Sequence, residues 1–212
     1  AELVTIGKAF DVARSGEYDC VIFDGPATGH ALAMLGAPRT FSRLGAIGPV
    51  TREAAELARR LADPAFAAYV GVTAPEPMAV EELFMLARSL PSTVGRGLDL
   101  VVVNAVHPDR FSDEEARRLR EAAERGPGRA LLEAVLAGHR RARREAEQVR
   151  RVRAQLDVPV VTVPFAFGAG PARGAAPAAA EHAVALAGAA RTEPAPLAGN
   201  AAARVSGVPE LR

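Results

Sequence analysis

Residues 18–35 read YDCVIFDGPATGHALAML, and this stretch decides the fold class. An apolar run at 20–23 ends in the carboxylate of Asp24 and gives way to a turn-rich stretch at 25–30, after which an Ala- and Leu-rich run begins. The pattern predicts a buried parallel strand over 19–24, which delivers an acidic side chain to a loop that feeds a helix. Open α/β sheets bind ligands outside the carboxyl ends of their strands, so Asp24 is expected where a phosphate-bound Mg²⁺ needs a carboxylate.

Three further segments are rich in Val and apolar along their whole length, at 68–74, 98–106 and 158–163. Runs without polar alternation predict strands of a parallel sheet that is covered on both faces. Helix-like stretches separate or follow these strands, at 51–62, 76–90, 112–156 and 175–190, and the chain also opens in a helical pattern. Alternating strands and helices predict a doubly wound α/β fold with a mostly parallel sheet and right-handed crossovers.

The chain between the first two predicted strands contains many residues that break regular structure. A helix is expected to begin near Thr51. Before it, glycines and prolines interrupt the chain at Gly36, Pro38, Gly45, Gly48 and Pro49. We therefore expect a loop-rich insertion next to the loop at 24–30.

A helical hairpin is predicted over about 112–156. Ser112 and Glu115 have the spacing of a helix capping box, and a Gly-Pro-Gly break at 126–128 divides the helical stretch that follows. We expect this hairpin to be a subdomain within a domain of residues 1–190. Residues 191–212 are rich in Pro, Ala and Gly and carry few large apolar side chains, which is typical of a disordered tail.

The composition excludes several classes of protein. With 212 residues, 49% of them hydrophobic and 24% charged, the chain can form one globular domain or a large part of one. A net charge of +1 demands no acidic partner, and no run approaches the roughly 18 apolar residues of a membrane span. No secretory pattern opens the chain, so a cytoplasmic location is the expectation. Cys20 is the single cysteine, which excludes an internal disulfide and predicts a small buried side chain within a strand.

The segment at 24–31, DGPATGHA, resembles the Walker B strand and second switch loop of the arsenical pump-driving, or anion-transporting, ATPase family, whose relatives include the ATPases that target tail-anchored proteins. The family pattern is roughly D-T-A-P-T-G-H-T. Asp, Thr, Gly and His match in register, while the Pro is displaced by one position and the final Thr is Ala. Two later segments, VVVNAVHP at 101–108 and VPF at 163–165, follow in the order expected of this family. The resemblance implies an incomplete sheet of the P-loop NTPase type.

The resemblance implies roles for the residues of the 24–30 loop. Asp24 is the metal-site carboxylate, which acts through a Mg²⁺-bound water, although an Asp that only caps the next turn is the alternative. Gly29, like Gly25, allows the backbone to approach a phosphate or to change conformation as a switch. Thr28 either orients water or caps the following helix. His30 couples the switch to the rest of the protein, or is only structural.

The same resemblance implies which residues bind the cofactor, ATP. Gly25 and Pro26 belong to the phosphate side of the site. Asn104, at the carboxyl end of a predicted strand, offers an acceptor and a donor to the N6 and N7 edge of adenine, unless it caps a loop. Pro164 and Phe165 correspond to a second wall of the adenine pocket. The chain departs from the family at 167–174, where an acidic residue is missing from the usual turn.

No G-x-x-x-x-G-K-[ST] sequence occurs in these residues. Lys8 lacks both the glycine-rich lead and the following Ser or Thr, so the backbone cradle for phosphates cannot be built around it. We therefore expect the chain to be the C-terminal part of a longer ATPase whose nucleotide loop lies upstream. A degenerate domain that never bound nucleotide is the alternative.

The resemblance implies a Mg²⁺-dependent ATPase, forming a homodimer, in which ATP hydrolysis changes the conformation of the helical hairpin. A protein or membrane-associated client is expected to bind through that hairpin. The Arg-rich helix at 139–153 carries no interleaved aromatic residues, so no nucleic acid is expected. Two rivals remain open: a non-enzymatic interaction module that keeps the α/β sheet, and a partitioning ATPase related by fold.

Overall fold

The computed structural model describes residues 2–43, 48–125 and 128–166. Within these ranges the chain is an α/β structure with six helices and three parallel strands. The helices are α1 (Glu2–Arg14), α2 (Thr28–Arg43), α3 (Pro49–Ala62), α4 (Pro77–Val94), α5 (Asp113–Arg125) and α6 (Arg129–Gln155). The strands are β1 (Val70–Thr73), β2 (Leu100–Val106) and β3 (Val160–Pro164). The predicted strands at 68–74, 98–106 and 158–163 are therefore confirmed.

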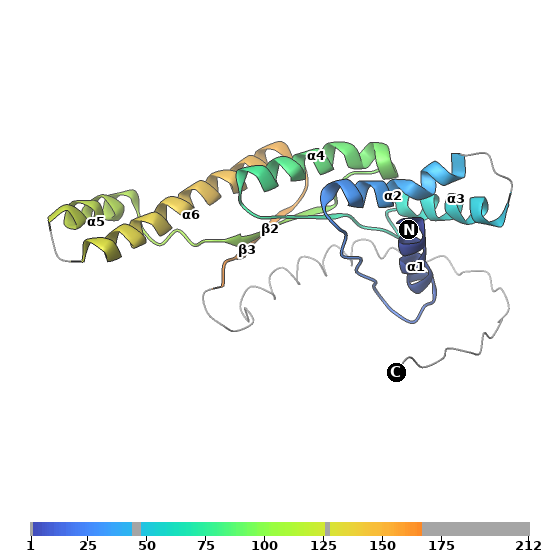
Figure 1. Cartoon of the computed structure of the whole chain (residues 1–212), viewed down its shortest axis with the longest axis horizontal. Helices are drawn as coiled ribbons and strands as arrows, with labels where there is room; N and C mark the ends of the chain where they lie inside the picture. The colour runs from blue at the N-terminus through green and yellow to red at the C-terminus, as the bar shows by residue number, and fades with distance from the viewer. Residues whose placement is uncertain (1, 44–47, 126–127, 167–212) are drawn as a thin grey trace.

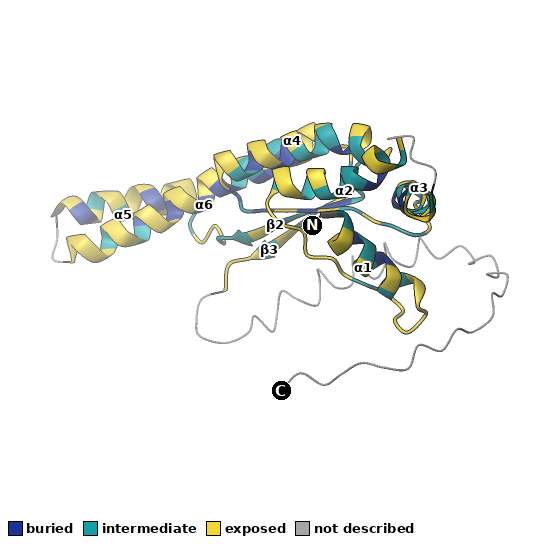
Figure 2. Ribbon diagram, turned by 45° about the vertical axis from the view of Figure 1, so that its right-hand side comes forward, coloured by how far each residue is buried: buried dark blue, intermediate teal, exposed yellow. Residues whose placement is uncertain are grey.

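The sheet has the order β1-β2-β3, and every pairing in it is parallel. Helix α4 connects β1 to β2, and the pair α5 and α6 connects β2 to β3 (Figure 1). An apolar core joins the sheet to α4 and α6. In it, Val101 and Val103 of β2 pack among side chains of these two helices, such as Phe84 and Val152. Figure 2 shows buried positions along β2 and on the parts of α4 and α6 that lie over the sheet.

The opposite face of the sheet is more open within the described residues. Val70 and Val72 of β1 are 50% and 65% exposed, whereas Gly71 and Thr73, which point the other way, are buried. The expectation of a sheet covered on both faces is therefore wrong for β1. The reason is topological, because two successive right-handed crossovers that move in the same direction along a sheet place their helices on the same face.

The predicted strand at 19–24 is also wrong. The backbone from 18 to 26 forms neither helix nor strand, and it pairs with none of the three described strands. Ile22 is 89% exposed, and Cys20, expected to be buried, is exposed as well. Apolar composition alone does not make a strand, since each strand needs a neighbour for its backbone hydrogen bonds.

The loop-rich insertion expected around Gly36 and Pro38 is instead a helix, because α2 continues through both residues. A proline inside a helix removes one backbone hydrogen bond, and here packing against α3 and α4 compensates for that loss. Pro38 is buried in this contact. A Cβ at Gly36 would lie 3.3 Å from Thr93 Cγ2 of α4, so the missing side chain permits the close approach of the two helices.

The predicted hairpin helices are present as α5 and α6, which lie against each other and extend away from the sheet (Figure 1). The capping box is confirmed, since the Glu115 N–H donates to Ser112 Oγ at 3.2 Å and the Ser112 N–H donates to Glu115 Oε2 at 2.8 Å. The helix predicted at 175–190 and the tail at 191–212 lie outside the described residues. Within the described ranges, no helix combines the length and the apolar character needed to cross a lipid bilayer.

Candidate functional site

The carboxyl ends of β2 and β3 meet at one edge of the sheet. The regular pairing of the two strands is interrupted between Val103 and Val106, and Val106 then pairs with Pro164. Just beyond, the Phe165 N–H donates to the Val106 carbonyl at 2.8 Å. Asn104 and Pro164, both predicted from the sequence to contact adenine, are thereby brought to the same edge as Phe165.

The interruption of β2 bends the backbone at Asn104 and Ala105. Ala105 has a φ of +60°, a left-handed conformation that residues other than Gly, Asn and Asp adopt infrequently. The exposed Asn104 side chain turns back on this bulge, and its Oδ1 accepts a hydrogen bond from the Ala105 N–H at 2.9 Å. Asn104 therefore has the capping contact that the sequence left open as an alternative to base recognition.

His107 and Phe165 stack on each other beyond the two strand ends. Their ring centroids lie 4.4 Å apart and the ring planes are 15° from parallel. The Nδ1 atom of His107 lies 3.0 Å from both carboxylate oxygens of Glu145, and the His107 backbone N–H donates to Glu145 Oε2 at 2.7 Å. Sequence analysis named Phe165 but missed His107, although a histidine directly after a predicted strand was a usable signal.

Glu145 is a buried carboxylate on α6, only 4% exposed. Arg141, one turn earlier on the same helix, donates from Nε to Glu145 Oε1 at 2.8 Å. Burial on its own raises the pKa of Glu145, yet the hydrogen bonds from the His107 backbone, from Arg141 and from the His107 ring outweigh it. The net effect is a pKa below the ordinary value, which keeps Glu145 ionised.

A second histidine and carboxylate pair joins α6 to the segment that follows His107. His139 of α6 is buried, and its Nδ1 lies 3.1 Å from Asp109 Oδ1. Arg143, also on α6, lies 3.6 Å from Asp109 and 3.5 Å from Asp113, which begins α5. The segment between β2 and α5 is thus held along α6 at both of its ends.

The residues predicted for metal and phosphate binding lie apart from this edge, with Asp24, Gly25 and Pro26 in the segment ahead of α2 and Thr28, Gly29 and His30 in the first turn of α2, where the sequence predicted a loop. Asp24, Gly25, Pro26, Gly29 and His30 are all exposed, and Thr28, where α2 begins, is partly buried. Helix α2 packs mainly against α1, α3 and α4. These contacts do not place the segment ahead of α2 at the β2–β3 edge.

A metal site built from protein ligands alone is not present in the described ranges, where no three His, Cys, Asp or Glu side chains form a group that could hold an ion. Mg²⁺ in nucleotide sites is usually held by one or two carboxylates together with phosphate oxygens and water. The exposed carboxylate of Asp24 fits that single-ligand role, which remains a prediction.

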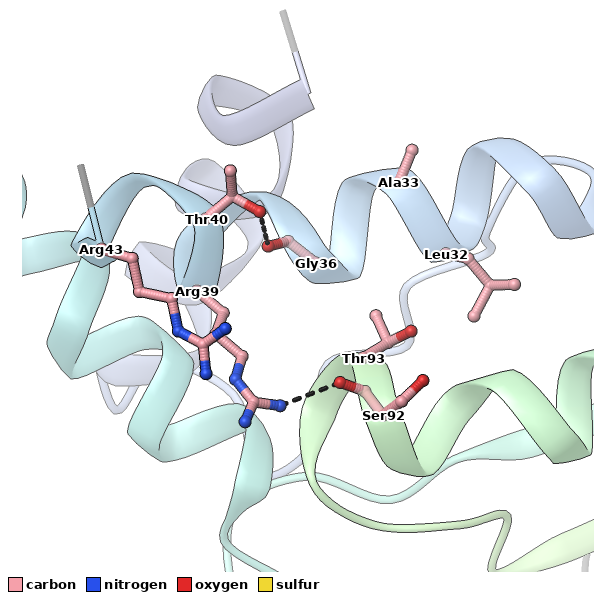
Figure 3. Close-up of a pocket in the computed structure, with 8 residues that line it drawn as sticks. All are labelled: Leu32, Ala33, Gly36, Arg39, Thr40, Arg43, Ser92 and Thr93. Atoms are coloured by element: carbon pink, nitrogen blue, oxygen red, sulfur yellow. Dashed lines mark hydrogen bonds between the residues drawn. The ribbon is translucent and has the colours of Figure 1, made fainter.

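A shallow pocket of about 330 Å³ lies between α2 and α4 (Figure 3). Its polar groups stabilise the ends of the two helices: Arg39 Nη1 donates to the Ser92 carbonyl at 2.9 Å, and Thr40 Oγ1 donates to the Gly36 carbonyl at 3.1 Å. Arginines are favoured near the negative C-terminal ends of helices. The pocket is therefore explained by helix packing, and none of the predicted site residues lines it.

Comparison with known proteins gives a partial likeness. The chain is 28% identical over 132 residues to a protein of Halobacterium salinarum that is described as "Putative arsenical pump-driving ATPase". The match covers 57% of this chain and 20% of that protein, so it corresponds to about a fifth of the length of the curated relative. No family model matches the chain. The likeness agrees with the resemblance of the motifs.

Proposed function

We propose that this chain contributes the metal-binding loop and the base-binding edge of a Mg²⁺-dependent ATPase related to the arsenical pump-driving enzymes. The observation that carries the proposal is the convergence of Asn104, Pro164 and Phe165 at the carboxyl ends of two neighbouring parallel strands. Nucleotides bind at this edge of open α/β sheets. The phosphate loop such an enzyme needs is not among the 212 residues, so the proposal concerns the protein that carries both parts.

The base is recognised at the bulge of β2. Asn104 Oδ1 has two lone pairs, so it can keep the Ala105 N–H and accept from the adenine N6 amino group as well. The Asn104 amide nitrogen donates to N7. Pro164 and Phe165 supply apolar contact to the ring from the end of β3.

Phosphoryl transfer takes place at the 24–30 loop. Asp24 is the residue that would hold a phosphate-bound Mg²⁺, and the ion would supply positive charge beside the phosphates. Gly25, Pro26 and Gly29 let the backbone approach the phosphates closely. Thr28 orients the attacking water, and His30 transmits the change of state at the loop. Hydrolysis then changes the placement of α5 and α6. The protein is a cytoplasmic homodimer, and a protein or membrane-associated client binds to it through these two helices.

The test is ATP binding and hydrolysis by the complete protein. Asp24→Asn is expected to lower turnover by about 10²-fold or more with a much smaller loss of ATP affinity, because the metal stabilises charge that is greatest in the transition state. Asp19→Asn is the matched control, since Asp19 is an exposed carboxylate of the same segment, and it should leave both quantities near the wild-type values.

Failure of the wild-type protein to bind ATP, or an equal loss of turnover in the two variants, would contradict the proposal. A non-enzymatic interaction module is the second candidate, favoured by the exposed apolar side chains Ile22, Val70 and Val72. An absence of ATP binding, together with saturable binding of a partner protein that is lost on Val72→Asp, would establish that candidate instead.

A further inference from the structure

The buried carboxylate of Glu145 joins the helical hairpin to the edge of the sheet. It accepts hydrogen bonds from the backbone and the ring of His107, which follows β2, and from Arg141 of its own helix. A buried carboxylate that loses its donors is costly, more so than a neutral polar group. Helix α6 and the end of β2 are therefore held together at this point.

His107 connects that carboxylate to both strands of the edge. It belongs to the chain that leaves β2, and its ring stacks on Phe165, which leaves β3. The Phe165 N–H in turn donates to the carbonyl of Val106, next to His107 in the chain. A displacement of either strand end consequently moves the groups that donate to Glu145.

The same edge stores backbone strain. Ala105, two residues before His107, is held at a φ of +60°, a left-handed conformation that is unfavourable for a residue with a Cβ. Such conformations persist only where the surroundings hold them, and here the Asn104 cap and the anchored His107 flank the strained residue. A ligand that changes the contacts of Asn104 therefore removes one of the contacts that hold Ala105 in its strained conformation.

The segment between β2 and α5 is also fixed to α6 by a second set of contacts. Asp109 is held by His139 and Arg143, both on α6, and Asp113 at the start of α5 is also close to Arg143. Movement at His107 is therefore passed to α6 directly, and it is not absorbed by the segment that links β2 to α5.

We propose that Glu145, acting through His107, is a positioning residue that couples occupancy of the base site to the placement of α5 and α6. This inference rests on the proposed function, because the ligand is the base of the nucleotide. A base bound by Asn104, Pro164 and Phe165 sets the positions of the β2 and β3 ends, and the Glu145 carboxylate, with its helix, follows its donors.

The experiment is hydrogen–deuterium exchange of the complete protein with and without a saturating non-hydrolysable ATP analogue. The wild-type protein is expected to change its exchange in the peptides of α5 and α6. In Glu145→Gln, which keeps the shape and loses the charge, that change should fall about fivefold or more. Glu147→Gln is the matched control, because Glu147 lies two residues further along α6, is exposed and forms an ion pair with Arg150, and it should behave as the wild type.

The possible results distinguish failure of the coupling from failure of the proposed function. Wild-type protein that binds the analogue without any change in α5 and α6 overturns the coupling and leaves the proposed function intact. Failure to bind the analogue overturns the proposed function and the coupling with it. An undiminished change in Glu145→Gln overturns the role of that residue. If thermal unfolding shows Glu145→Gln to be misfolded, His107→Asn removes the ring stack, keeps the backbone donor, and should give the same loss of response.

Discussion

The Glu145 carboxylate makes the stability of the folded chain depend on pH. Burial raises its pKa, but the donors from His107 and Arg141 prevail and hold the folded value below 4.5. A carboxyl with a lowered folded pKa stabilises the protein above its unfolded pKa, and this contribution is lost as pH falls through the folded pKa. The free energy of unfolding of the wild type should therefore exceed that of Glu145→Gln most clearly above the ordinary pKa of a glutamate, about 4.3, and the gap should narrow as pH falls below that value.

Urea unfolding at a series of pH values measures that gap. Glu147→Gln serves again as the control, because its exposed ion pair contributes little to stability. A gap between wild type and Glu145→Gln that stays constant from acid to neutral pH would show that the shape of the side chain matters and its charge does not.

Asn104 allows base recognition to be separated from phosphate chemistry. If its amide contacts the N6 and N7 edge, Asn104→Ala should weaken ATP binding by about 1–3 kcal/mol, since buried polar groups lose their partners. GTP presents an acceptor where ATP presents a donor, so the wild type should prefer ATP more strongly than the variant does. The measurement is the ratio of the ATP and GTP dissociation constants, and an unchanged ratio in a folded variant would leave Asn104 with its capping role alone.

Individual residues of the edge differ in how far sequence could predict them. Asn104, Pro164 and Phe165 follow apolar runs, and the carboxyl ends of neighbouring parallel strands must meet, so their convergence could be foreseen. The contact between Glu145 and His107 spans 38 residues of chain. Whether Glu145 or Glu147 faces the sheet depends on the rotation of α6 about its axis, which tertiary packing fixes.

At the scale of elements, the contact between β1 and α4 depends on the absence of a side chain at one position. A Cβ on Gly71 would lie 2.7 Å from Leu83 Cδ1 and 3.2 Å from Leu98 Cδ1. Gly71→Ala should therefore destabilise the fold by about 1–3 kcal/mol, as overpacked cores do. Gly138→Ala is the contrasting change, because its Cβ would meet nothing within 4 Å in the middle of α6, and it should be neutral or stabilising by up to about 1 kcal/mol.

Chemical denaturation of the two glycine variants beside the wild type provides the measurement. An unchanged stability in Gly71→Ala would contradict the packing described for β1 and α4, and a loss of stability in Gly138→Ala would contradict the open space described beside that residue of α6.

The elements that sequence misjudged were those decided by neighbours. The apolar run at 19–24 has strand composition, yet none of the described strands pairs with it. Helix α2 contains Gly36 and Pro38, which favour a loop, but its contacts with α3 and α4 outweigh that preference. By contrast β2, α5 and α6 carry strong internal patterns, and sequence placed them within a few residues of their observed bounds.

For the molecule as a whole, sequence predicted an alternating parallel α/β arrangement, and the three strands and their crossovers agree with it. It did not predict how the layers are distributed. Both crossovers run along the order β1-β2-β3, so α4 and α6 share one face, and the exposed Val70 and Val72 belong to the other. The apolar pattern of a single strand does not show on which side of it the next strand in the chain is added to the sheet.

Because α6 is long, a small tilt of the helix near Glu145 produces a large displacement of its first turn. The helix has 27 residues, with Val149 and Val152 fixed in the core and its first turn remote from the sheet (Figure 1). Glu145 lies roughly 24 Å along the axis from Arg129, so a tilt of about 10° at the joint displaces that end by roughly 4 Å. Distances measured by paired spin labels, one on the exposed Leu131 and one on the exposed Met78 of α4, should therefore change with nucleotide in the wild type and stay constant in Glu145→Gln. Under the proposed coupling, a small change at this buried carboxylate would displace the far end of α6 by enough to open or close a contact made there.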